Sequence, residues 1–225
     1  AVKFIRDSAG RSEPLFLWLG PQAPHVPSTY SERHGADFRN SGAPRVPSFN
    51  EGDVSAKPSW VRQISYMTDA QIDDADRFQR FRLRSLRAVE DMIEAVVQAL
   101  AETGRLERTY VVFTSDNGLL MGQHRAVGRK GNAYEESIGI PLIVRGPGVV
   151  AGRTDAIALT IDLAPTLLDL AGVPVPESVD GRSLAPFLRG TPPASWRTDA
   201  LVENPGAGPS YSLRTTEWMY NHQDT

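Results

Sequence analysis

The chain has 225 residues, with 24 Lys or Arg against 27 Asp or Glu, and 40% of it is hydrophobic. A chain of this size buries roughly 70% of its unfolded surface, so we expect one substantial core and no extended disorder. The formal net charge of −3 argues against a nucleic-acid partner, and the apolar runs are too short for a membrane span of about 20 residues. The lack of Cys excludes disulfides, thiolate metal sites and a cysteine nucleophile within these residues.

The first quarter of the chain is predicted to hold a short helix, one strand and a long loop. Residues 2–9 indicate the end of a helix, which Gly10 closes. Residues 15–19 are apolar throughout, which predicts a strand buried on both faces, as in a parallel sheet. Residues 24–60 are rich in Pro, Gly, Ser and charge and indicate a long irregular loop, and loops of that length inside a compact domain are usually functional.

The next segment predicts a helix followed by a second strand. Between residues 72 and 101 the apolar side chains recur mostly every three or four positions, which is typical of a long amphipathic helix, and Thr103-Gly104 closes it. The arginines within residues 77–87 are interpreted as a solvated helix face. Residues 109–115 are β-branched and aromatic and predict a second buried strand. The strand at residues 15–19, the helix and this second strand would make a crossover unit.

The remaining elements complete an α/β pattern. Residues 140–144 predict a third strand and residues 162–170 a helix, while residues 201–202 and 211–220 indicate short edge strands. Strands that alternate with helices predict an open, mostly parallel sheet flanked by helices, with short antiparallel edge strands near the C-terminus. Ligands of such sheets bind at the carboxyl ends of the strands.

The most informative polar residues are Asp116 and Asn117, directly after the predicted strand 109–115. A carboxylate and an amide oxygen are hard ligands that suit Ca²⁺ or Mg²⁺. The alternative is a simple turn, because Asn-Gly is a strong hairpin signal. Taken alone, the motif favours the turn.

Two further candidates follow on the same stretch of chain. Lys130 lies in Gly-Arg-Lys-Gly, where its compact ammonium would suit an oxyanion, although a lysine considered by itself is more often a surface residue. His124, in Gly-Gln-His, is open to the same two interpretations.

His25 lies between two prolines just after the first predicted strand. If that strand and the one before Asp116 are parallel, both residues fall at one end of the sheet. An imidazole there can bind an anion or protonate a leaving oxygen, and a histidine that only caps the loop fits the sequence equally well. His34 and His222 have no comparable context.

A series of short motifs follows in order along the chain, at residues 24–27 (Pro-His-Val-Pro), 84–91, 114–118 (Thr-Ser-Asp-Asn-Gly), 122–124 (Gly-Gln-His), 130 (Lys), 134–137 (Tyr-Glu-Glu-Ser), 141–148, 161–168 and 180–184. Together they resemble the sulfatase family, in the alkaline-phosphatase-like superfamily. The resemblance covers residues 1 to about 190, and an ordered series of this length is specific in a way that none of its members is.

The resemblance implies a role for each candidate. Asp116 and Asn117 would ligate the divalent cation, usually Ca²⁺ in sulfatases, with Mg²⁺ or Mn²⁺ as alternatives. Lys130 would bind the sulfate, His25 would contact the sulfate or its leaving oxygen, and His124 would lie near the substrate. Relatives that hydrolyse phosphonate or phosphate esters often carry His at the position of Asn117, so the asparagine favours sulfate esters.

The chain departs from the family at its start. Sulfatases resemble one another most in an amino-terminal half that carries paired metal-binding aspartates and a Cys/Ser-x-Pro-x-Arg motif converted to formylglycine, and this sequence contains no such motif. The resemblance thus implies that residues 1–190 are the carboxy-terminal part of a catalytic domain, with the loop 24–60 inside it, and that residues 191–225 begin a truncated C-terminal subdomain. We expect this chain to be inactive by itself and to pair with the remainder of its own catalytic domain.

The implied activity is hydrolysis of the sulfate ester of a small molecule or glycan to an alcohol and sulfate. Two alternatives stay open: a phosphonate monoester or phosphodiester hydrolase of the same superfamily, and a non-catalytic binding module. An exposed sheet edge would favour self-association, which is compatible with a homo-oligomer. Sulfatases occur in the periplasm, outside cells and in lysosomes, and some bacterial ones are cytoplasmic, so the family leaves the compartment open.

Overall fold

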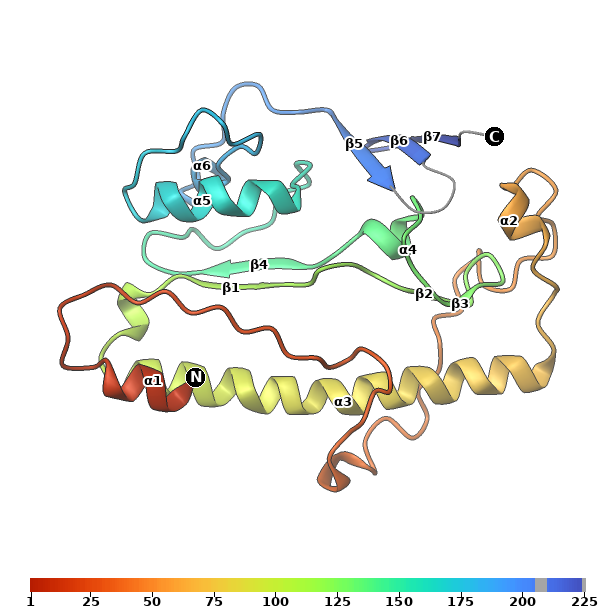
Figure 1. Ribbon diagram of the computed structural model, residues 1–225, viewed down its shortest axis with the longest axis horizontal. Helices are drawn as coiled ribbons and strands as arrows, with labels where there is room; N and C mark the ends of the chain where they lie inside the picture. The colour runs from red at the N-terminus through yellow and green to blue at the C-terminus, as the bar shows by residue number, and fades with distance from the viewer. Residues whose placement is uncertain (205–209, 224–225) are drawn as a thin grey trace. The chain divides into compact units, whose positions relative to one another are not determined.

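The computed structural model describes residues 1–204 and 210–223, which divide into two compact units. Unit 1 comprises Ala1–Thr109 and Leu119–Lys130, and unit 2 comprises Tyr110–Gly118 and the chain from Gly131 onward. Unit 1 contains α1 (Val2–Asp7), the 3₁₀ helix η1 (Glu32–His34), α2 (Ser59–Arg62), α3 (Asp69–Glu102), the 3₁₀ helix η2 (Leu106–Arg108), β2 (Leu120–Met121) and β3 (Val127–Arg129) (Figure 1). Unit 2 contains β1 (Val111–Thr114), α4 (Glu135–Ile138), β4 (Leu142–Arg145), the 3₁₀ helix η3 (Thr160–Asp162), α5 (Leu163–Leu170), α6 (Ala185–Leu188), β5 (Asp199–Asn204), β6 (Ser210–Thr215) and β7 (Met219–Gln223).

The long helix α3 confirms the helix predicted from the apolar spacing. It begins with a capping box, in which Thr68 Oγ1 accepts a hydrogen bond from Gln71 N and the Gln71 side chain accepts one from Thr68 N. It ends where predicted, with Gly104 in the left-handed conformation at a φ of 65°. Both helix ends are therefore set by local sequence.

Helix α1 packs on α3 within unit 1 (Figure 1). Ile5 is fully buried, and Arg6 pairs with Glu102 at 2.8 Å. Arg105, itself buried, donates to the carbonyl oxygens of Ser8 and Arg11. The predicted short helix is thus confirmed, and the segment that follows it is held by the C-terminal end of α3.

Arg77 is exposed, but the other arginines within residues 77–87 do not form the solvated face that we predicted. Arg80, Arg84 and Arg87 are half-buried, because they hold the irregular loop against the helix. Arg80 donates to the Ser41 carbonyl at 3.1 Å and Arg84 Nε to the Asp37 carbonyl at 2.8 Å. The arginine side chains donate to backbone carbonyl oxygens of the loop that pair with no strand. This explains how an irregular segment satisfies its backbone hydrogen-bonding groups.

The loop and the β2–β3 hairpin share a small apolar core with α3. Ala43, Ala75 and Met121 are buried together, with Phe49 and Phe78 packed against them. A Cβ added to Gly122 would lie 2.2 Å from the Phe49 ring, so only glycine fits there. This packing fixes the segment that begins at Leu120 and carries the predicted site residue His124 against the loop.

Unit 2 contains an antiparallel pair and a three-stranded sheet. β1 pairs with β4 from Val111 opposite Arg145 to Thr114 opposite Leu142. β5, β6 and β7 form an antiparallel meander, which confirms the short edge strands predicted near the C-terminus. Helix α5 confirms the helix predicted at residues 162–170.

The mostly parallel sheet is not found among the described residues, because all of their paired strands are antiparallel. Residues 15–19 form no strand, and Phe16 and Trp18 are 72% and 74% exposed, so the expectation of a strand buried on both faces is wrong for this chain. A strand requires a neighbour that accepts its backbone hydrogen bonds, and no described segment pairs with these residues. The crossover unit that depended on this strand is therefore absent.

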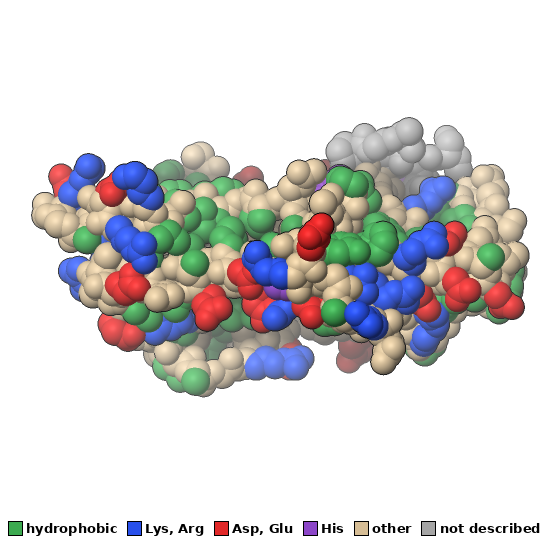
Figure 2. Space-filling view, turned by 90° about the horizontal axis from the view of Figure 1, so that it is seen from below, with side chains coloured by type: hydrophobic (Ala, Val, Ile, Leu, Met, Phe, Trp, Pro, Cys, Tyr) green, Lys and Arg blue, Asp and Glu red, His purple; other side chains and the backbone are tan. Residues whose placement is uncertain are grey.

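The surface agrees with the near-neutral composition. Figure 2 shows acidic and basic side chains mixed on the face that it draws, without a continuous basic area among the described residues there. Within residues 1–204 and 210–223, no helix is long and apolar enough to cross a bilayer.

Candidate functional site

Asp116 and Asn117 follow the carboxyl end of β1, as predicted. Asp116 is exposed, and its Oδ1 accepts a hydrogen bond from Asn117 N at 2.9 Å and from Ser115 Oγ at 3.3 Å. Asn117 Nδ2 donates to the Gly118 carbonyl at 2.7 Å, which leaves its amide oxygen oriented as an acceptor. The turn therefore presents carboxylate and amide oxygens.

The turn is not the tight hairpin that Asn-Gly alone favours. β1 pairs with β4, whereas β2, the next strand in the chain, pairs with β3. Gly118 instead donates its N–H to the Ser137 carbonyl at 2.8 Å, and a Cβ there would lie 2.1 Å from the Glu136 carbonyl oxygen. The glycine is required by this close approach to α4, so the motif has a structural reason besides its chemical one.

His25 is exposed on a loop that is closed by its own hydrogen bonds. Its N–H donates to the Gln22 carbonyl at 2.8 Å, its carbonyl accepts from Ser28 N at 2.9 Å, and Ser28 Oγ donates to the Pro24 carbonyl at 3.0 Å. The imidazole Nδ1 lies 3.0 Å from the Val26 carbonyl oxygen. The backbone is thus fixed while the ring faces outward.

His124 is buried, and a carboxylate from the irregular loop holds it. Its Nδ1 lies 2.6 Å from Glu51 Oε1, and its backbone N–H donates to the Ser48 carbonyl at 2.8 Å. His124 and Arg125 both have positive φ, at 53° and 61°, which is strained for residues with a side chain. The carboxylate favours a proton on Nδ1 and so presents Nε2 as the other nitrogen.

Lys130 directly follows β3 and is exposed. Gly128 and Gly131 flank it, both with φ near 70°, so the backbone turns sharply on either side of the ammonium. The neighbouring Arg129 stacks on Trp60 with its guanidinium carbon 5.8 Å from the ring centre. The two adjacent cations therefore differ in environment: Arg129 stacks on an aromatic ring, and Lys130 lies between two backbone turns.

His25, His124 and Lys130 lie in unit 1, whereas Asp116 and Asn117 lie in unit 2. That these five residues surround one cation and one sulfate stays a prediction. Within the described residues, no group of three or more His, Cys, Asp or Glu side chains is arranged to hold a metal ion. The side-chain oxygens of Asp116 and Asn117 are of the type that calcium binds. They supply only two of the roughly 6–8 oxygen ligands that calcium takes.

Three residues with specific contacts were missed by sequence reasoning. Glu51 lies in an irregular loop whose sequence gives no sign of its partner. Arg125 donates to three carbonyl oxygens, those of Glu51, Gly52 and Ile64. His34, predicted to have no context, is buried with Asp37 at 3.3 Å on one nitrogen and Asp91 at 3.1 Å on the other.

We expect Glu51→Gln to change the tautomer of His124. The carboxylate can only accept a hydrogen bond from Nδ1–H, whereas the amide can also donate one to Nδ1, so the population with the proton on Nε2 should rise. Ring ¹⁵N chemical shifts of His124 report this directly. Loss of the buried bond should also cost about 1–3 kcal/mol of unfolding free energy. Glu32→Gln is the matched control, since Glu32 is exposed and lies outside the pair; equal ring shifts in both variants would contradict the assignment.

Solved structures identify the fold of this chain. The phosphonate monoester hydrolase SpPMH from Silicibacter pomeroyi superposes with a TM-score of 0.80 at 26% identity, covering 99% of this chain and 51% of that one. BT4656, in complex with its substrate D-glucosamine-2-N,6-O-disulfate, superposes with a TM-score of 0.60 at 30% identity, covering 75% of this chain and 36% of that one. The fold is therefore the α/β fold of sulfatases and alkaline-phosphatase-like hydrolases.

The sulfatase family model matches residues 1–173, and the chain belongs to the sulfatase family. Human N-acetylglucosamine-6-sulfatase is 39% identical over 205 residues, which are 90% of this chain and 37% of that protein. The extracellular sulfatase SULF-1 homolog of Drosophila melanogaster is 32% identical over 212 residues, which are 92% of this chain and 19% of that protein. The chain thus spans less than half the length of these relatives.

Proposed function

We propose that this chain is the carboxy-terminal part of an enzyme that hydrolyses sulfate esters to an alcohol and inorganic sulfate. The observation that carries the proposal is the match to the sulfatase model over residues 1–173, a stretch that contains all five candidate site residues. Residues 1–190 would be the catalytic-domain part. Residues 191–225, with the β5–β7 meander, would begin the C-terminal subdomain.

Each candidate residue of this chain would have its own role in binding the cation or the sulfate ester. Asp116 and Asn117 would hold a Ca²⁺ ion, or Mg²⁺ or Mn²⁺, and the bound ion would neutralise sulfate charge as a Lewis acid. Lys130 would bind sulfate oxygens through its ammonium. His25 would donate a proton to the leaving oxygen or bind the sulfate, and His124, oriented by Glu51, would face the substrate with Nε2.

A sulfated glycan is the substrate class we favour. The similarity to N-acetylglucosamine-6-sulfatase and to a glucosamine disulfate complex supports it. The similarity to an extracellular sulfatase supports a location outside the cytoplasm. The formylglycine nucleophile would come from a sulfatase amino-terminal half, which would also be the partner of the exposed residues Phe16 and Trp18.

A phosphonate monoester hydrolase is the second candidate, because SpPMH has the highest TM-score of the structures compared above. Side-by-side rates of a full-length protein containing this sequence on phenyl sulfate and phenyl phosphonate separate the two. We expect the sulfate to be preferred. A higher kcat/KM on the phosphonate would overturn the assignment, and no turnover of either would favour a non-catalytic binding module.

The 225-residue chain alone should neither turn over sulfate esters nor bind calcium tightly. Sulfate-ester cleavage requires a positioned nucleophile, and two oxygen ligands fall well short of a calcium site. We expect undetectable release of 4-nitrocatechol from its sulfate and a calcium Kd weaker than about 10⁻³ M by calorimetry. Tight calcium binding that survives Asp116→Ala would place the cation elsewhere.

A further inference from the structure

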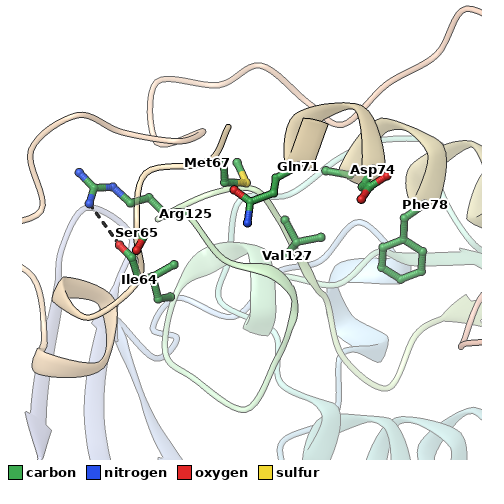
Figure 3. Close-up of a pocket in the computed structure, with 9 residues that line it drawn as sticks. Ile64, Ser65, Met67, Gln71, Asp74, Phe78, Arg125 and Val127 are labelled. Carbon is green, nitrogen blue, oxygen red and sulfur yellow. Dashed lines mark hydrogen bonds between the residues drawn. The ribbon is translucent and has the colours of Figure 1, made fainter. Parts of the chain in front are cut away.

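A pocket of about 580 Å³ opens in unit 1 between the start of α3 and the segment from Arg125 to β3 (Figure 3). This volume lies within the range of about 300–1,000 Å³ that is typical of small-molecule sites. The walls come from three parts of the chain that are distant in sequence. They are the loop with Ile64, Ser65 and Met67, the first turns of α3 with Gln71, Asp74, Ala75 and Phe78, and the pair Arg125 and Val127.

The pocket has an apolar floor and a polar rim. Met67 and Ala75 are buried and Phe78 is half-buried, whereas Ser65, Gln71 and Asp74 are exposed. In Figure 3 the Gln71 amide lies between Met67 and Val127, with Asp74 and Phe78 further along α3. Such a site offers an apolar surface to one face of a ring and hydrogen-bonding groups to its edge.

The charges of the rim are already compensated. Asp74 pairs with Arg77 at 2.7 Å, and the Arg125 guanidinium donates to three backbone carbonyl oxygens. Figure 3 shows that guanidinium directed toward the loop carbonyls rather than toward Gln71 and Phe78. An anion gains little from such a site, so the ligand should be neutral and should carry hydroxyl or amide groups for the rim.

A short stretch of chain joins the pocket lining to the candidate sulfate-binding residue Lys130. Arg125 follows His124, and Val127 begins β3, which leads into Lys130. Three residues of chain span at most about 10 Å, so a group in the pocket and a sulfate at Lys130 lie within reach of one short oligosaccharide.

We propose that this pocket binds an unsulfated sugar ring next to the sulfated unit of an oligosaccharide substrate. The proposal rests on the proposed sulfatase function, and it selects a glycan over an aryl or steroid sulfate. An aryl ring would cover the apolar floor but would offer no acceptor to the N–H groups of the Gln71 side chain, because the Gln71 amide oxygen already accepts from Thr68 N.

The test is a titration of the 225-residue chain, labelled with ¹⁵N and selectively with ¹³C-methyl groups. The probes are the unsulfated disaccharide of N-acetylglucosamine, 4-nitrophenol and inorganic sulfate. We expect the disaccharide to shift the signals of Met67, Gln71 and Val127 with a Kd on the order of 1 mM. Shifts at these residues that are produced by 4-nitrophenol or sulfate and not by the disaccharide, or no shifts at all, would overturn the proposal.

Val127→Glu places a bulky charge in the pocket and should weaken disaccharide binding about tenfold, or roughly 1.4 kcal/mol. Val46→Glu is the matched control, because Val46 is 40% exposed against 38% for Val127 and lies outside the pocket lining. Equal affinities of the two variants for the disaccharide contradict the site.

Failure of this proposal is distinguishable from failure of the proposed function. The titration contains no sulfate ester, so absent sugar binding overturns the pocket assignment alone. In a full-length protein, sulfatase activity that is equal for a sulfated monosaccharide and a sulfated disaccharide, and is unchanged by Val127→Glu, also overturns the pocket while the sulfatase assignment stands.

Discussion

Asp162→Ala should lower the free energy of unfolding of the chain by about 3–5 kcal/mol. Asp162 is fully buried, and its carboxylate accepts hydrogen bonds from Leu159 N and Arg182 N, both at 2.8 Å. Arg197 completes the set as a two-pronged ion pair and is itself only 10% exposed. The substitution leaves a buried guanidinium and two amides without their acceptor, and urea or thermal unfolding measures the loss.

Asp155→Ala is the control for this substitution. Asp155 pairs with Arg153 at 3.1 Å, but the two side chains are 86% and 89% exposed, so the expected change is below about 0.5 kcal/mol. A similar loss in both variants would show that Asp162 does not hold unit 2 together.

The same carboxylate gives a pH dependence of defined sign. Burial raises the pKa of Asp162, but hydrogen bonds from Arg197 and from the two backbone amides outweigh it, so the pKa lies below its ordinary value. A lowered pKa stabilises the folded state above a pH of about 4, and this stabilisation is lost as the pH falls through the folded-state pKa. The parent chain should therefore lose its stability advantage over the Asp162→Asn variant as the pH falls. The difference between their free energies of unfolding should be largest above a pH of about 4 and should shrink in acid.

Local patterns predicted what depends on local contacts. The helix at residues 72–101 follows from apolar spacing and a capping sequence, both of which act within a few residues. Residues 15–19 also have a clear pattern, but a strand depends on a partner that can lie anywhere in sequence, and the described chain provides none. The prediction of a solvated arginine face on α3 is wrong for the same reason, since Arg84 donates to a carbonyl 47 residues away.

The same contrast between local motifs and distant contacts applies to the candidate site. Asp116, Asn117 and Lys130 stand in recognisable short motifs, so sequence alone identified them as candidates. Glu51 was missed because its partner, His124, is 73 residues further along, in a stretch with no regular secondary structure. Contacts that join an irregular loop to a distant turn leave no periodic signal in sequence.

Lys130→Ala, in a full-length protein that contains this sequence, should lower kcat/KM for a sulfate ester by about 10²–10³. The ammonium is placed by a backbone that turns at Gly128 and Gly131, and we propose that it meets the charge of the sulfate oxygens. Lys130→Arg should recover part of the loss, because a planar guanidinium keeps the charge but not the compact shape. Arg129→Ala is the matched control, since it removes an adjacent exposed cation that stacks on Trp60, and we expect less than about a threefold change. If Arg129→Ala costs as much as Lys130→Ala while both proteins unfold at the parent temperature, the sulfate is bound by the general positive charge of the segment and not by Lys130.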